Sequence, residues 1–450
     1  MRPMLLRWLW DRLSTSFWFW PTIMTLVGAG LAFGFCAVDT ALQGTAYEPS
    51  AWVWTGGPEG ARMLLGTLAG AVITVESTVF SITIVALTLA SNAFGPRLLR
   101  NFIRDRGNQL ILGTFTATFV YFLLVLRTIR GGEEAAFVPN VSISVALTLT
   151  LVDVGVLIYF IHHVATTIQA DEVVAIAGHD LERAIAELHT RGDYARDGDG
   201  APEGPSCPLR APASGYLQAV EEDTMVAALV RCDGVAHLAV RPGDFVIAGS
   251  VIAEVWREGP AGELDEEVAA ALGRALLIDD RRTPLQDLEF SLHQLVEIAS
   301  RALSPGINDP FTAMTCVDWL ASGLARLAQR PPATGCRRDE AGRLRLLDRP
   351  ITFRGALCAA FDPLRHIATG LPQVVMRMME ALATVAGFVD AADDRDAIRA
   401  LAGRLERVGH TWPEEQDRRD LDTRHRQVLL ALDRSGEVDR APAHEVARAS

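Results

Sequence analysis

Apolar residues are concentrated in the first third of this chain, where long apolar stretches alternate with short polar segments. Four stretches stand out, at residues 17–38, 65–90, 108–128 and 139–161. About 20 mostly apolar residues in a helix are needed to cross the hydrocarbon of a bilayer. The first stretch is rich in Trp and Phe and lacks the small-residue cleavage pattern of a signal peptide. The pattern predicts a multi-domain membrane protein whose residues 1–165 form a transmembrane domain of four helices.

Beyond residue 165 the apolar runs become short. A helix and a linker rich in Gly, Asp and Pro are expected at 166–210. Short β-prone runs follow, namely "GYLQAV", "MVAALVR", "GVAHLAV" and "FVIAGSVIAEV". Runs of this length between turn residues are typical of strands, so residues 211–258 are predicted to form a small β module. Its "VRPGDFVIAGSVIAEV" stretch resembles half of a biotinyl- or lipoyl-type barrel-sandwich domain.

Helical periodicity returns after the β module. We expect a helical cytoplasmic domain at 265–435 and a disordered tail at 436–450. A capping box, Thr283-Pro284-Leu285-Gln286, predicts one helix start. The stretch 331–353 is interpreted as a linker with a hairpin. Later helices are predicted at 354–369, 372–388, 392–408 and 413–432.

The stretch "ALSPGINDPFTA", residues 302–313, interrupts this periodicity. Pro305 and Gly306 are expected to end one helix, and Asp309 is expected to cap the free amides of the next. The stretch is therefore interpreted as the elbow of a helical hairpin. Asn308 has no structural explanation at this stage. Asn308 and Asp309 consequently remain candidates for a ligand site as well.

The arginines of the short polar segments predict the orientation. Basic residues in short loops favour the cytoplasmic side of the membrane. They occur in the N-terminal segment and after the second stretch, whereas residues 39–60 contain only acidic charges. Both termini are therefore expected to be cytoplasmic, in the inner membrane of a bacterium.

Composition excludes several function classes. The 42 basic residues are all Arg, so a lysine Schiff base and a biotinyl or lipoyl attachment are ruled out, and no cofactor is expected. The six cysteines form no C-x-x-C pair, and no metal site is expected. The net charge of −13 argues against nucleic acid as a partner. None of the common catalytic or nucleotide-binding motifs is present, and we expect no enzymatic activity.

Small and polar residues recur at helical spacing in the second apolar stretch. They are Gly70, Thr74, Ser77, Ser81, Thr88 and Ser91. Residues three or four apart share one helix face, so these form a polar stripe. Such a stripe favours close packing of helices. The alternative is that Ser77, Ser81 and Thr88 line a pore.

Two acidic residues fall inside the apolar stretches. Glu76 is in the second and Asp153 in the fourth. A charge at the centre of a bilayer costs about 3 kcal/mol on insertion scales, so it rarely faces lipid. Each side chain either joins helices through a hydrogen bond or forms an ion or proton site.

Two further charged groups are candidates for binding. Arg97, Arg100 and Arg104 follow the second stretch on one face of a predicted amphipathic helix. That arrangement is typical of contact with anionic lipid, and in an oligomer it also suits an anion-attracting mouth. Near residue 280, Arg281, Arg282 and Asp287 belong to a dense charge cluster. This cluster is either a solvated set of salt bridges or part of a ligand site.

Several motifs together resemble one bacterial family. They are "VFSITIVALTLASNAFGPRLLRNFIRDR", "LGTFTATFVY", "SGYLQAV", "VRPGDFV", "RRTPLQDLEF" and "IASRALSPGINDPFTAM". The chain resembles, over roughly residues 10–430, the uncharacterised membrane proteins called domain of unknown function 2254. The resemblance implies an N-terminal membrane region and a cytoplasmic C-terminal region. It brings no catalytic residue.

Two classes of function fit these features. One is a homo-oligomeric ion channel or transporter, whose cytoplasmic modules form a vestibule. The other is a membrane-anchored sensor or scaffold that binds a cytoplasmic partner or ligand. The polar residues within two spans favour the first class, and the lipid bilayer and further copies of the chain are the expected partners.

Overall fold

A computed structural model describes residues 18–42, 54–94, 106–131, 137–167, 169–188, 201–257, 262, 264–331 and 335–438. The chain divides into two compact units, Met1–Glu172 and Val173–Ser450. Each unit buries its own cluster of apolar side chains. The division falls just after the last apolar stretch, where the sequence changes from long to short apolar runs.

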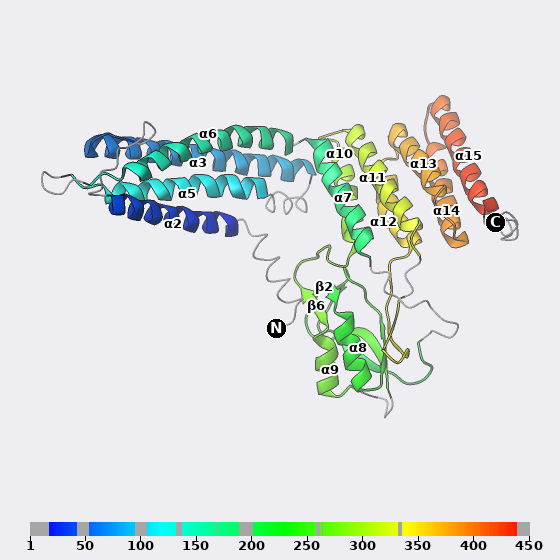
Figure 1. The fold of residues 1–450 in the computed structure, drawn as a ribbon. Coiled ribbons are helices and arrows are strands. Elements are labelled where there is room, and N and C mark those ends of the chain that lie inside the picture. The colour runs from blue at the N-terminus through cyan, green and yellow to red at the C-terminus, as the bar shows by residue number, and fades with distance from the viewer. Residues whose placement is uncertain are drawn as a thin grey trace, which may run out of the picture. The chain divides into compact units, whose positions relative to one another are not determined.

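The first unit contains four long helices, α2 (Phe19–Leu42), α3 (Pro58–Phe94), α5 (Arg106–Thr128) and α6 (Asn140–Thr167) (Figure 1). Each is long and apolar enough to cross a membrane. The prediction of four helices that could span a membrane is thereby confirmed. The helix α3 begins about two turns before the apolar stretch that predicted it, because Pro58 at its first position and Glu59 in its first turn favour a helix start.

Helix α5 packs against the other three helices of this unit and is the most buried of them. Glycines allow α2 to approach it closely. A Cβ atom on Gly28 would lie 2.6 Å from the carbonyl oxygen of Ala117, and one on Gly113 would lie 2.6 Å from the sulfur of Met24. Small residues of this kind are typical of contacts between transmembrane helices.

Two charged side chains form hydrogen bonds with backbone groups at the end of the bundle where α6 begins. Asp39, near the end of α2, accepts hydrogen bonds from the backbone amides of Val141 and Ser142, both at 2.9 Å. It also accepts one from the Ser142 hydroxyl at 2.6 Å. Asp39 therefore supplies the negative charge that a helix N-terminus favours. Nearby, Arg62 donates to the carbonyl oxygen of Ile129, just after α5 ends.

The second unit contains two sheets. One has the order β1-β5-β3-β8-β7 and the other the order β4-β2-β6. The strands are β1 (Cys207–Arg210), β2 (Gly215–Val220), β3 (Val235–Leu238), β4 (Phe245–Val246), β5 (Val251–Trp256), β6 (Leu276–Asp279), β7 (Cys336–Arg338) and β8 (Leu344–Leu347). Adjacent strands in both sheets run antiparallel, except that β3 and β8 run parallel to each other.

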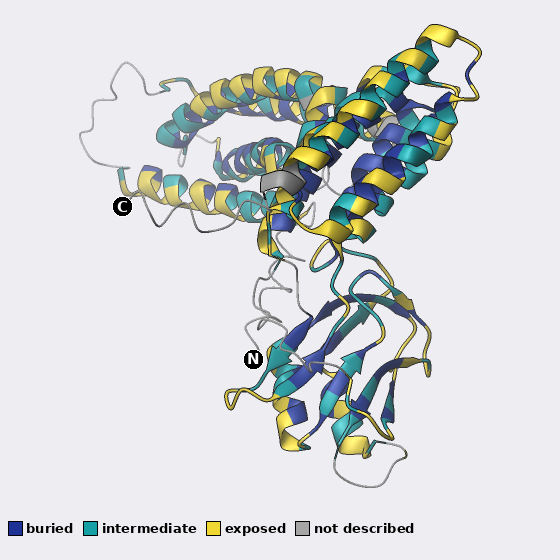
Figure 2. Ribbon diagram, turned by 90° about the vertical axis from the view of Figure 1, so that its right-hand side faces the viewer, coloured by how far each residue is buried: buried dark blue, intermediate teal, exposed yellow. Residues whose placement is uncertain are grey.

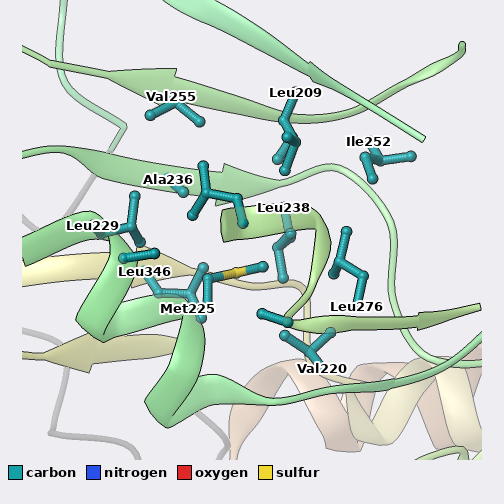
Figure 3. Close-up of a cluster of buried hydrophobic side chains, with 14 of the residues drawn as sticks. Leu209, Val220, Met225, Leu229, Ala236, Leu238, Ile252, Val255, Leu276 and Leu346 are labelled. Carbon is teal, nitrogen blue, oxygen red and sulfur yellow. The ribbon is translucent and has the colours of Figure 1, made fainter. Parts of the chain in front are cut away.

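Two short helices, α8 (Glu222–Arg231) and α9 (Glu266–Gly273), pack on these strands. Figure 3 shows the shared core, in which Met225 and Leu229 of α8 meet Leu238 and Leu346 of the strands. The prediction of a strand for "MVAALVR" is therefore wrong. The buried residues Met225, Ala228 and Leu229 follow helical spacing, and Glu222 and Asp223 occupy the first turn, where acidic residues favour a helix.

The sheets also extend beyond the residues predicted for the β module. The strand β6 lies in a region predicted to be helical. The hairpin expected at 331–353 is present as β7 and β8, and it joins the larger sheet through β3. Such pairing between distant segments leaves no local sequence signal. The likeness to a barrel-sandwich domain remains a prediction.

The rest of the second unit is helical (Figures 1 and 2). Its helices are α7 (Ala170–Glu187), α10 (Leu288–Ala302), α11 (Pro310–Ala328), α12 (Phe353–Ile367), α13 (Pro372–Ala386), α14 (Ala392–Gly409) and α15 (Glu415–Val438). The predicted helices after residue 353 are confirmed to within a few residues at most ends. Helix α15 runs to Val438, beyond the predicted start of the tail, and residues 439–450 lie outside the described part.

The helix predicted to start at Thr283 starts later. Helix α10 begins at Leu288, and Asp287 is its N-cap, accepting a hydrogen bond from the Phe290 amide. The side chain of Gln286 is unavailable for a capping box because it binds the backbone amide and carbonyl of Val220 at the end of β2. A contact with a distant strand thus overrides the local capping signal.

The elbow between α10 and α11 has the predicted form. Asp309 accepts hydrogen bonds from the amides of Phe311 and Thr312 and from the Thr312 hydroxyl. Asn308 has a φ of +50°. Asparagine is one of the few side chains that tolerate this left-handed conformation, so the turn itself explains the residue that the sequence left unexplained.

Candidate functional site

The strongest candidate site lies within the four-helix unit, around the half-buried side chain of Glu76 on α3. The hydroxyl of Thr116, on α5, donates a hydrogen bond of 2.6 Å to Oε1 of Glu76. The second carboxyl oxygen, Oε2, is buried and has no hydrogen-bond partner among the described residues. Burial of a polar atom without a partner is costly, and such atoms often mark a place where a proton, ion or water is handled.

A second acidic side chain has a similar environment. Asp153, on α6, is only 4% exposed. The hydroxyl of Thr118 on α5 donates to its Oδ1 at 3.3 Å. Its Oδ2 is buried without a partner in the described part of the chain. Asp153 therefore repeats the arrangement found at Glu76, with one oxygen bound to a threonine and the other unbound.

Helix α5 connects these two groups. Thr116 and Thr118 are two residues apart, which separates them by roughly 200° around a helix, so one faces α3 and the other faces α6. We call the carboxyl groups of Glu76 and Asp153 the carboxyl pair, because each accepts a hydrogen bond from a threonine of α5. Both belong to candidate spans. Helix α5 therefore binds an acidic side chain of a candidate span on each of two faces.

The Thr116 hydroxyl has two acceptors for its single proton. It lies 2.6 Å from Oε1 of Glu76 and 2.9 Å from the carbonyl oxygen of Leu112. When Glu76 is ionised, Thr116 can donate to it. When Glu76 is protonated, Glu76 can donate to Thr116, which then donates to Leu112. The site can therefore accommodate both protonation states of Glu76 without rearranging the helices.

The polar stripe of α3 does not belong to this site. Ser77, Ser81 and Thr88 are exposed on the four-helix unit. The hydroxyls of Ser77 and Thr88 donate to backbone carbonyls one turn earlier in the same helix. Of the predicted pore residues, the structure thus places Glu76 and Asp153 against threonines of α5 and leaves the other three exposed.

The other predicted site residues are placed differently. Arg97, Arg100 and Arg104 lie outside the described residues. In the charge cluster, Arg282 forms an ion pair with the buried Asp287, and Glu289 forms ion pairs with Arg241 and Arg282. Burial opposes the charge of Arg282, but the hydrogen bonds that Arg282 donates to Asp287 outweigh it and raise the pKa of Arg282.

This cluster has a structural role. The capping carboxylate of Asp287 packs against Gly243 in the turn before β4. Arg281 contributes its backbone carbonyl, which accepts a hydrogen bond from Gln218. The cluster therefore fastens the start of α10 to the smaller sheet. At the elbow, the hydrogen bond from the Thr312 hydroxyl lowers the pKa of Asp309, against the effect of burial, as expected for a capping carboxylate.

The sequence did not point to Thr116, Thr118 or Asp39. Threonine is common in apolar spans, where its hydroxyl usually binds the helix's own backbone, and Thr114 next to them does so. The charge of Asp39 was visible only as part of a loop. In the described ranges, no three His, Cys, Asp or Glu side chains are grouped as metal ligands would be.

Comparisons with known proteins give a consistent result. The family model described as "Predicted membrane protein (DUF2254)" matches residues 14–384. An uncharacterised protein of Mycobacterium bovis is 32% identical over 438 residues, which covers 96% of this chain and 82% of that protein. An uncharacterised protein of Mycobacterium tuberculosis matches with the same identity and coverage. No solved structure matches the chain with significance.

Proposed function

The chain belongs to the DUF2254 family of predicted membrane proteins, and we propose that its four-helix unit is a channel or transporter in which the carboxyl pair takes up and releases protons. Glu76 is the group that exchanges protons, and Thr116 and Thr118 hold the two carboxyl groups in place. The transported species is a proton or a cation that moves together with one. The proposal assigns transport to the protein and no enzymatic activity.

The observation that carries this proposal is the pair of buried carboxyl oxygens, Oε2 of Glu76 and Oδ2 of Asp153, that have no hydrogen-bond partner among the described residues. A hydrogen bond that only joins helices would need no acidic group, since Gln or Asn serves that purpose with less cost in a membrane. Carboxyl groups at this depth are typical of proton relays. The two acceptors of Thr116 support the same reading, because they serve both protonation states.

Homo-oligomerisation is part of the proposal. The exposed stripe with Gly70, Thr74 and Ser77 on α3 has small side chains, and a Cβ atom added at Gly70 would meet no other described group within 4 Å. Small residues on an outward face suit contact with another transmembrane helix. We therefore assign the stripe to contact between copies and the carboxyl pair to transport within each copy. The orientation with both termini in the cytoplasm of a bacterial inner membrane is retained.

The test is proton flux through the full-length protein in liposomes that contain a pH-sensitive dye, driven by a membrane potential. Wild-type protein is expected to acidify or alkalinise the lumen according to the sign of the potential. Glu76→Gln keeps the shape of the side chain and is expected to lower the flux to the level of empty liposomes. Thr78→Val, an exposed position two residues away and outside the stripe, is the matched control and should leave it unchanged. Equal flux in Glu76→Gln and wild type would contradict the proposal.

A sensor or scaffold is the second candidate. The size of the second unit, Val173–Ser450, favours it, because this unit has its own core and could bind a partner. The same liposomes separate the two candidates. Absence of flux in wild-type protein at every potential and pH tested would support the sensor or scaffold.

A further inference from the structure

A groove runs along the surface of the four-helix unit between α2 and α5. Its lining includes Trp18, Pro21, Thr25, Leu26, Leu112 and Thr116. Its volume is about 310 Å³, at the lower end of the roughly 300–1,000 Å³ that small-molecule sites have. Leu26 is 67% exposed and Trp18 is 60% exposed, so within the described residues the groove opens outward.

The groove has an apolar lining in spite of its threonines. The hydroxyl of Thr22 donates to the carbonyl oxygen of Trp18 at 2.8 Å, and that of Thr25 donates to Pro21 at 2.7 Å. Both hydroxyls are therefore occupied by the helix backbone. A cavity holds water only if it offers the water two or more polar partners. This lining favours a hydrocarbon occupant over water.

The position of the groove points to the source of that hydrocarbon. Both helices are long and apolar enough to span a membrane, and the groove faces away from the bundle. The surrounding medium at this depth is the acyl chains of lipids. Trp18, at the start of α2, has the amphipathic ring that prefers the headgroup level of a bilayer. A single acyl chain would thus enter beside Trp18 and run along Leu26 and Leu112.

The inner part of the groove touches the candidate site. Thr116 lines the groove and also donates its hydrogen bond to Glu76. We propose that the groove binds one acyl chain of a membrane lipid, and that this chain covers Thr116 and limits the access of water to Glu76. The second half of this inference rests on the proposed transport function, whereas the first half stands independently of it.

The binding is tested with the full-length protein in liposomes that contain a trace of phospholipid with a photoreactive group along one acyl chain. After illumination, peptides are mapped by mass spectrometry. Cross-links are expected to be several times more frequent at residues 21–26 and 112–116 than at Leu151 or Ile158, which are exposed apolar residues on α6. Equal labelling of all these positions would overturn the proposal, because the chains would then contact the groove only as general solvent.

Variants that fill the groove make the test specific. Thr25→Trp and Thr22→Trp are expected to remove the excess labelling, whereas Leu31→Trp, on α2 but outside the lining, should retain it. Variants that elute like wild type in size-exclusion chromatography are compared. Proton flux is measured on the same samples. If labelling is lost but flux is unchanged, the acyl chain binds in the groove but does not limit the access of water to Glu76. If both filled variants retain the excess labelling, the groove does not bind an acyl chain.

Discussion

The hydroxyl of Thr116 lies 2.6 Å from Oε1 of Glu76 and donates its hydrogen bond across the contact between α5 and α3. The same hydroxyl lies 2.9 Å from the carbonyl oxygen of Leu112 in its own helix. The Thr116 hydroxyl thus has two acceptors, the carboxyl group of Glu76 on another helix and a backbone carbonyl of its own helix. This relationship is the basis of the proposal that Glu76 exchanges protons.

The first prediction concerns this hydroxyl. Thr116→Val removes the donor but keeps the shape of the side chain, so Glu76 loses its hydrogen bond and proton flux in liposomes should fall strongly. Thr116→Ser keeps the hydroxyl and should retain most of the flux. Thr114→Val is the control, because the Thr114 hydroxyl donates to the carbonyl oxygen of Leu110 in its own helix. A Thr116→Val protein with wild-type flux would show that the hydroxyl has no part in transport.

The second prediction concerns the cap of α6. Asp39→Ala removes the acceptor for two amides and one hydroxyl. Hydrogen bonds to a charged group contribute about 1.5–3 kcal/mol each, so we expect a clear drop in the melting temperature of the protein in detergent. Thr40→Ala is the control, since its hydroxyl is exposed and binds only Cys36 in the same helix. Equal melting temperatures for both variants would contradict the assigned role.

The third prediction concerns the elbow. Asp309→Ala should lower the free energy of unfolding of the second unit by about 1 kcal/mol, because the first amides of α11 lose their acceptor. Asp309→Ser should recover most of that loss, since a cap requires only a short side-chain oxygen. Thermal unfolding of the full-length protein measures both. If Asp309→Ser unfolds like wild type but abolishes function, the carboxylate has a role beyond the cap.

The fourth prediction separates a steric contact from backbone strain. Gly243 and Gly249 both have positive φ angles, +100° and +82°, and a side chain there costs about 1–2 kcal/mol. A Cβ atom on Gly243 would also collide with the carboxylate of Asp287, whereas nothing lies within 4 Å of that position at Gly249. Gly243→Ala should therefore lower the melting temperature more than Gly249→Ala. Equal changes in melting temperature would mean that the Asp287 carboxylate moves aside at little cost in stability.

The fifth prediction concerns pH. Burial raises the pKa of Asp348, although the nearby Arg337 acts in the opposite direction. Its Oδ1 is buried and has no hydrogen-bond partner in the described part of the chain. An acid whose folded pKa is raised favours the folded state below its unfolded pKa, near 3.9, and this contribution is lost as pH rises through the folded pKa.

Asp348→Asn should consequently be at least as stable as wild type at pH 7, and the advantage should shrink toward pH 4. Melting temperatures of both proteins between these pH values are the measurement. A variant that is less stable than wild type at pH 7 would show that the ionised carboxylate is well accommodated, with Arg337 dominating over burial.

The sequence predicted those features that depend on local composition. Apolar length alone located the four spans, and Asp309 before a proline located the start of α11. Glu76 and Asp153 stood out because acidic residues are rare in apolar stretches. Their selection as candidates needed no knowledge of the fold.

Features that depend on tertiary pairing were not accessible in this way. The partners Thr116 and Thr118 were hidden because only the packing of α5 decides which threonine meets an acidic group. The direction of the α3 stripe likewise depends on which face of α3 meets α5. Helix α10 starts later than expected because Gln286 binds Val220, 66 residues earlier in the chain. The local sequence around Gln286 contains no sign of this contact.

The most direct test of the central claim is the protonation of the carboxyl pair itself. Infrared difference spectra of the full-length protein in lipid bilayers, recorded against pH, show the carbonyl band of protonated carboxyl groups. We predict a band that changes with pH while the protein stays folded, that loses intensity in Glu76→Gln, and that shifts in Asp153→Asn because helix α5 binds both carboxyl groups. A spectrum in which neither substitution alters this band at any pH would contradict the account, because Glu76 and Asp153 would then exchange no proton with water.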